Sequence, residues 1–142
     1  MTSTAADQVK ILVAEDEKDI RELVSITMKL AGYQVFTASD GAEALDMVTQ
    51  IMPDLILMDV RMPKMTGYEA CVAIKKIPQV QDIPVVFLSA KGQETEIQQG
   101  LAAGAVAYVL KPFAPTELTA QIKALLAEFG KKESLETPKE SD

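Results

Sequence analysis

Short runs of apolar residues alternate along this chain with longer segments in which apolar residues recur every three or four positions. The short runs are 10–14, 34–38, 55–58, 85–88 and 107–110. Most of these runs are almost unbroken, which is typical of strands buried on both faces of a parallel sheet. The run at 34–38 alternates between polar and apolar residues and predicts a strand with one partly exposed face.

The segments that follow these runs have helical periodicity. We expect helices over residues 18–31, 42–51, 68–77, 94–103 and 115–129. In the first helix, the residues that share one face are Ile20, Leu23, Val24, Thr27, Leu30 and Ala31. We expect that face to be buried. Gly32 and Gly104 are expected to end the helices that precede them, because glycine adopts the left-handed conformation found after a helix.

The segment 94–103 has the weakest apolar pattern of the predicted helices. Its main apolar positions are Ile97, Leu101 and Ala102, and glutamines separate them. A helix with so few apolar contacts is expected to be mobile.

This alternation of strands and helices predicts an α/β fold. Short strands joined by helical segments favour a doubly wound sheet of five parallel strands, with right-handed crossovers and helices on both faces. We assign residues 9–130 to one domain, with a flexible N-terminal segment at 1–8. Residues 131–142 are polar and of mixed charge, which predicts a disordered tail or a linker.

Polar side chains that could bind a ligand or take part in catalysis follow four of the five predicted strands. Glu15 and Asp16 follow the first run, Asp59 the third, Ser89 the fourth and Lys111 the fifth. The carboxyl ends of parallel strands share one edge of the sheet, where open α/β folds bind ligands. We therefore expect these side chains to form one site.

The residue types in this set suit phosphoryl transfer to Asp59. Crowded carboxylates raise one another's pKa unless a cation lies between them, and hard oxygen ligands favour Mg²⁺. A metal ion would neutralise phosphoryl oxygens during in-line transfer to the Asp59 carboxylate. Lys111 can pair with the acid and then with the phosphoryl group, and Ser89 can donate a hydrogen bond to a phosphoryl oxygen.

Four motifs in this chain resemble the receiver domain of two-component response regulators, including the receivers of chemotaxis. The matching segments are Ile11-Leu12-Val13-Ala14-Glu15-Asp16-Glu17, Leu57-Met58-Asp59-Val60-Arg61-Met62-Pro63, Leu88-Ser89-Ala90, and Gly104-Ala105 with Tyr108-Val109-Leu110-Lys111-Pro112-Phe113. The resemblance covers roughly residues 9–129. It implies a flavodoxin-like receiver fold with five helices and the strand order 2-1-3-4-5.

The resemblance also assigns roles at the site. Asp59 becomes the phosphoacceptor, and a sensor histidine kinase or a phosphotransfer protein becomes the donor. Asp16, Asp59 and the backbone carbonyl of Arg61 would hold Mg²⁺, with Glu15 acting through water. Lys111 would complete the catalytic set together with Ser89.

Further positions carry conformational and kinetic roles by the same resemblance. Ser89 and Tyr108 take the places of the coupled hydroxyl and aromatic residues that move on phosphorylation. Arg61 and Lys91 occupy positions that tune the lifetime of the phosphoryl group, and we expect these basic side chains to attract anionic donors and shield the acyl phosphate. The Lys111–Pro112 peptide bond is expected to be cis.

Composition narrows the function. The net charge of −7 disfavours non-specific binding to nucleic acid, so we expect no direct nucleic-acid contact. No apolar run approaches the ~20 residues that span a membrane, and no leader sequence is visible, so a cytoplasmic protein is expected. We expect Cys71, the single cysteine, to be a small core residue. The absence of histidine excludes Ser-His-Asp catalysis and histidine-ligated zinc.

The face formed by the fourth helix, fifth strand and fifth helix departs from the dimer-forming relatives that carry winged-helix outputs. Val106-Ala107 replace the usual acidic pair, Gln98-Gln99 lie where a basic residue is expected, and Gln121 replaces an arginine. We expect a monomer or a weak phosphorylation-dependent dimer. The same face is expected to bind a downstream protein that the sequence does not name.

Two receiver functions stay open. The chain is either a single-domain response regulator or a receiver domain excised from a hybrid kinase or larger regulator. A phosphohydrolase with an aspartyl-phosphate intermediate needs a general acid two residues after the nucleophile, and Arg61 in that place cannot give up a proton at neutral pH. Neither phosphate-binding glycine motif of nucleotide-binding proteins occurs. We therefore expect a signalling domain and not an enzyme.

Overall fold

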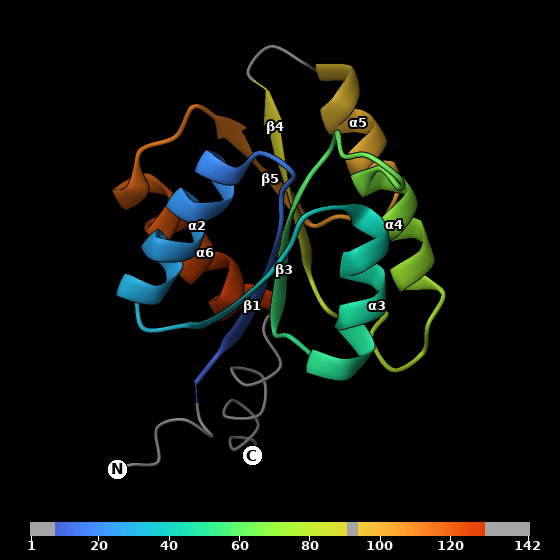
Figure 1. Ribbon diagram of the computed structural model, residues 1–142, viewed down its shortest axis with the longest axis horizontal. Helices are drawn as coiled ribbons and strands as arrows, with labels where there is room; N and C mark the ends of the chain where they lie inside the picture. Colours follow the sequence, from blue (N-terminus) through green and yellow to red (C-terminus); the bar gives the residue numbers. More distant parts are fainter. Residues whose placement is uncertain (1–7, 91–93, 130–142) are drawn as a thin grey trace.

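The computed structural model describes residues 8–90 and 94–129 of the chain. A single parallel sheet forms the middle layer, with α2 and α6 on one face and α3, α4 and α5 on the other (Figure 1). The elements are β1 (Lys10–Ala14), α2 (Lys18–Leu30), β2 (Gln34–Ala38), α3 (Gly41–Ile51), β3 (Leu55–Asp59), α4 (Gly67–Lys75), β4 (Val85–Ala90), α5 (Glu94–Ala102), β5 (Ala107–Lys111) and α6 (Pro115–Phe129). The α/β fold expected from the sequence is confirmed.

The strand order is β2-β1-β3-β4-β5, and every neighbouring pair is parallel. From β1 the chain first winds outward to β2 and then returns to β3 on the other side of β1. The connections therefore reverse direction between β1 and β3, and this switch point leaves a crevice at the carboxyl ends of the two strands. Ala14 pairs with Met58 in the register, so the residues that follow them lie side by side.

The core has two halves because successive strand residues point to opposite faces of the sheet. Leu12, Ile56 and Met58 pack under α3 and α4, whereas Val13 and Leu57 pack under α2 and α6. All of these side chains are fully buried. This double burial explains why the central strands read as unbroken apolar runs.

The buried face of α2 differs in part from the one expected. Val24 and Thr27 are buried as expected, and Ser25 and Met28 are buried as well. Leu23 and Leu30, in contrast, are 43% and 84% exposed, so the helix is rotated relative to the expected face. Amphipathic periodicity shows that a helix has two faces, but packing against the sheet decides how a narrow stripe is oriented.

The apolar residues of α5 contribute little burial, which agrees with the weak apolar pattern of this segment. Leu101 is 43% exposed and Ala102 is exposed, while Ile97 is half-buried. Among residues 95–102, the buried ones are Glu96 and Gly100. A carboxylate therefore takes one of the few buried places on this helix, which the apolar pattern does not reveal.

No helix among the described residues is long and apolar enough to cross a membrane. The proposed N-terminal segment falls almost entirely outside the described residues, and the C-terminal tail does so completely.

Candidate functional site

Three carboxylates meet at the carboxyl edge of the sheet. Glu15 and Asp16 follow β1, and Asp59 ends β3. One ligand atom from each lies within 4.8 Å of the other two. Glu15 is fully buried and Asp59 is 7% exposed, whereas Asp16 faces solvent. The set offers hard oxygen donors with one side open to water, which fits a divalent cation such as Mg²⁺.

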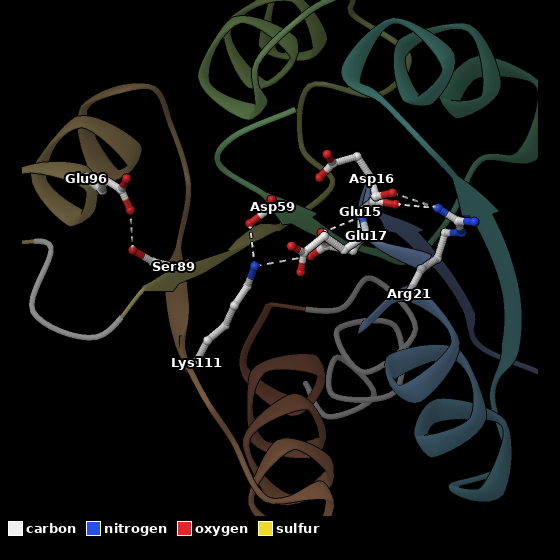
Figure 2. A network of polar contacts seen from close by, with 8 residues as sticks. All are labelled: Glu15, Asp16, Glu17, Arg21, Asp59, Ser89, Glu96 and Lys111. Atoms are coloured by element: carbon white, nitrogen blue, oxygen red, sulfur yellow. Dashed lines mark hydrogen bonds and ion pairs between the residues drawn. The ribbon is translucent and has the colours of Figure 1, made fainter. Parts of the chain in front are cut away.

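Lys111 brings a positive charge to these acids from β5. Its ammonium Nζ donates to Asp59 Oδ1 at 2.9 Å and to Glu15 Oε1 at 3.3 Å (Figure 2). The lysine is 52 residues from Asp59 along the chain. The predicted proximity of Lys111 to Glu15 and Asp59 is therefore confirmed.

Burial sets the acid strength of the cluster. Burial raises the pKa of Glu15 from 4.5 to about 7; the Asp59 charge adds to this, and the Glu17 backbone N–H and Lys111 oppose it. Burial likewise raises the pKa of Asp59 against the opposing effect of Lys111. Burial acts to lower the pKa of Lys111, but its hydrogen bond and charge interaction with Asp59 raise it overall. One lysine therefore does not neutralise the cluster, and a further cation would favour its ionised form.

Arg21 holds the loop after β1. Its Nη1 donates to the backbone carbonyls of Glu15 at 2.9 Å and Asp16 at 3.4 Å. The backbone N–H of Glu17 donates to Glu15 Oε2 at 3.1 Å. Helical periodicity does not reveal this contact, because it gives no sign that the Arg21 side chain reaches back to the preceding loop.

Gly67 begins α4 directly beside Asp59. A Cβ at residue 67 would collide with the backbone oxygen of Asp59 and lie 2.9 Å from the ring of Phe87. Thr66 and Glu69 form a capping box that fixes the helix start. This close approach of backbones requires glycine and ties the loop after β3 to the strand end.

The Ser89 hydroxyl donates its hydrogen bond to Glu96 and not to Asp59 in this structure. Ser89 is 1% exposed, and its Oγ lies 3.1 Å from Glu96 Oε1 on α5 (Figure 2). Glu96 Oε2 also accepts from Arg61 Nε at 2.7 Å. Glu96 could not be recognised from the sequence, because one glutamate in a polar helix carries no signal of burial.

The remaining predicted residues are placed as follows. Tyr108 is 36% exposed on β5, and its carbonyl accepts a hydrogen bond from Gln121 at 2.9 Å. The Lys111–Pro112 bond is cis, as the resemblance implied. Lys91 lies outside the described residues. The switching role of Tyr108, the lifetime-tuning role of Arg61 and its carbonyl's place at the metal remain predictions.

Comparisons with known proteins agree with this fold. The family model described as "Response regulator receiver domain" matches residues 11–123. This chain belongs to that family.

Curated relatives include a probable transcriptional regulator ycf27 of Guillardia theta, which is 43% identical over 122 residues, 86% of this chain and 47% of that protein. The DNA-binding dual master transcriptional regulator RpaA of Synechocystis is 39% identical over 117 residues, 82% of this chain and 48% of that protein. Among solved structures, the chemotaxis response regulator CheY4 of Vibrio cholerae aligns with a TM-score of 0.80 and 37% identity, covering 84% of this chain and 99% of that one.

This chain spans about half the length of the curated relatives it matches. Their transcriptional activity therefore belongs to proteins with a further region that this sequence does not match. The expectation that this chain makes no direct contact with nucleic acid stays a prediction.

Proposed function

We propose that Asp59 accepts a phosphoryl group from a phosphohistidine on a sensor kinase or phosphotransfer protein, and that the domain then changes its affinity for a downstream protein. One observation carries the proposal: the Asp59 carboxylate lies between a metal-competent acid cluster and the Lys111 ammonium. This arrangement suits the transfer of an anionic group, because the acceptor oxygen has a lysine cation on one side and oxygen ligands for a metal cation on the other.

In the proposed transfer, an Asp59 carboxylate oxygen attacks phosphorus in line with the donor nitrogen. The N–P bond breaks as the O–P bond forms, and the imidazole nitrogen keeps the electron pair. Mg²⁺ held by Asp16, Asp59 and the Arg61 carbonyl, with Glu15 through water, would neutralise the phosphoryl oxygens. Lys111 then pairs with a phosphoryl oxygen in place of the free carboxylate, and the Ser89 hydroxyl donates a hydrogen bond to another phosphoryl oxygen.

The exposed face of α2 supports a docking site for the phosphodonor. Leu23, Ile26 and Leu30 are 43%, 55% and 84% exposed and lie on neighbouring turns. Leu23 also lines a groove of about 370 Å³ that reaches Lys111 and Phe113. An apolar surface that reaches Lys111, the lysine paired with Asp59, suits a partner that must bring its phosphohistidine to Asp59.

The domain acts as a signalling module, catalyses only its own phosphorylation and dephosphorylation, and works in the cytoplasm as a monomer or weak phosphorylation-dependent dimer. Its output is carried by the face formed by α5, β5 and α6. The second candidate is the receiver domain of a longer transcriptional regulator, in which another domain binds DNA. The half-length match to such regulators favours this candidate.

A phosphorylation assay tests the proposal. The protein is incubated with Mg²⁺ and phosphoramidate, and intact-mass spectrometry follows the gain of one phosphoryl group. We expect one group on the wild type, none on Asp59→Asn, and none on the wild type when EDTA removes Mg²⁺. Continued labelling of Asp59→Asn would refute the assignment, and turnover of many equivalents of a phosphomonoester would instead indicate a hydrolase.

A further inference from the structure

Helix α5 is attached to the rest of the domain mainly by polar contacts. Among residues 95–102, Glu96 and Gly100 are buried and Ile97 is half-buried, whereas the other side chains face solvent. Gly100 packs directly against the Phe87 ring, where a Cβ would lie 2.7 Å from a ring carbon. A helix with so little apolar burial depends on its polar contacts for its position.

Glu96 provides those contacts, and they lead to three different elements. Its carboxylate accepts from Ser89 on β4 and from Arg61 in the loop after β3. Its backbone carbonyl accepts from the Tyr68 hydroxyl on α4 at 2.9 Å. The Tyr68 ring itself packs edge-on against Phe87, with centroids 5.6 Å apart. The first turn of α5 is therefore fastened beside the phosphoacceptor site.

The Ser89 contact excludes the contact that phosphorylation requires. A serine hydroxyl has one proton and can donate it to one acceptor at a time. In this structure the acceptor is Glu96 Oε1, at 3.1 Å. A phosphoryl oxygen on Asp59 would need the same proton, so the Glu96 carboxylate and the phosphoryl group compete for one donor.

We propose that Glu96 forms an inhibitory contact with Ser89 and Arg61, and that it must release both residues before the phosphorylated state can form. The inference rests on the proposed function and adds a positioning residue to it. Release would free the first turn of α5. It would also allow the Arg61 side chain, which is 77% exposed, to move its guanidinium toward the phosphoryl group. Phosphorylation at Asp59 would thus be linked to movement of α5 through a residue on that helix.

Binding of beryllofluoride in the presence of Mg²⁺ tests the inference, because this ion mimics a phosphoryl group without covalent chemistry. Its affinity is measured by isothermal titration for the wild type, Glu96→Ala and Glu96→Gln. We expect Glu96→Ala to bind beryllofluoride about tenfold more tightly, since the buried charge-assisted hydrogen bond to Ser89 no longer has to be broken; the pair with the exposed Arg61 side chain adds little. Glu96→Gln keeps an acceptor but loses the charge, so a smaller gain is expected. Asp46→Ala removes an exposed acid from α3 and should match the wild type.

A second background separates competition for donors from simple charge repulsion. In a Ser89→Ala Arg61→Ala protein, Glu96 has lost both side-chain donors, so adding Glu96→Ala should change beryllofluoride affinity less than twofold. A tenfold gain that persists in this background, or that Asp46→Ala reproduces, would overturn the inhibitory contact.

Controls on the wild type distinguish this inference from the proposed function. If the wild type binds beryllofluoride and Asp59→Asn does not, the phosphoacceptor site stands; unchanged or weaker binding by Glu96→Ala then rejects the inhibitory contact alone. If the wild type does not bind, both proposals fail. Hydrogen exchange over residues 95–102 gives an independent measure: beryllofluoride should speed it in the wild type, and Glu96→Ala should show fast exchange without the ion.

Discussion

Replacing Glu15 with glutamine should stabilise the metal-free protein at alkaline pH. Glu15 is fully buried and belongs to a cluster of three carboxylates with Lys111 as the cation in contact with it. Its pKa is about 7 in the folded protein against an ordinary value of 4.5. The folded state therefore binds more protons than the unfolded state between these two values, so the free energy of unfolding falls as pH rises through this window.

The size of the effect follows from the two pKa values. A difference of about 2.5 in pKa corresponds to about 3 kcal/mol, and this full penalty applies above pH 7. Glutamine removes the charge but leaves the Glu17 N–H without its carboxylate acceptor, which costs about 1 kcal/mol. We therefore expect Glu15→Gln to be about 2 kcal/mol more stable than the wild type at pH 8, and nearly equal to it at pH 5.

Urea unfolding followed by circular dichroism in EDTA at both pH values measures this difference. Glu17→Gln is the matched control, because Glu17 is exposed and its variant should stay within about 0.5 kcal/mol of the wild type at each pH. Saturating Mg²⁺ at pH 8 should shrink the advantage of Glu15→Gln, since the cation offsets the charge that the variant removes. Destabilisation by Glu15→Gln at pH 8, or an effect equal at both pH values, would show that burial of the charge does not govern this site.

Further predictions concern the elements that position the site and the core behind it. Gly67→Ala should lower the free energy of unfolding in urea by about 3 kcal/mol or more, because the added Cβ collides with the backbone oxygen of Asp59. Gly32→Ala is the control: its Cβ meets no atom within 4 Å, so only the strain of a φ of +100° remains, which costs about 1 kcal/mol. Thr66→Ala removes the capping box of α4 and should cost about 1 kcal/mol, while thermal unfolding of the exposed Thr49→Ala should be unchanged or slightly raised. Burial raises the pKa of the Cys71 thiol to about 11, so a disulfide reagent at pH 8 should label it only as the protein unfolds; rapid labelling in native buffer would contradict this.

The residues of the site could be identified from the sequence because each one directly follows a short apolar run. Glu15, Asp59, Ser89 and Lys111 are recognised by purely local signals, namely an apolar run that ends at a polar residue. The rule that carboxyl ends of parallel strands share an edge then brings them together without further information. The hydrogen bonds from Lys111 to Asp59 and Glu15 bear this out across long separations in the chain.

Helix orientation could not be predicted in the same way. A periodic pattern leaves the rotation of a helix about its axis uncertain by a residue or so, and the difference decides which side chain is buried. Met28 is buried in α2 and Leu23 is not, and the carboxylate of Glu96 is buried in α5 while Leu101 is exposed. For the same reason, periodicity does not reveal that Arg21 donates to the loop that holds the acids.

The sequence alone determined the order of the elements, the α/β class and the set of side chains at the carboxyl edge, because these depend on periodicity and on strand direction. Only the tertiary structure decided the electrostatic and hydrogen-bonding state of that set. Burial from surrounding elements raises the pKa of Glu15, and the docking of α5 gives Ser89 its partner in Glu96. Both effects arise from distances between residues that are remote in the chain or on separate elements, and such distances exist only once the helices have packed against the sheet.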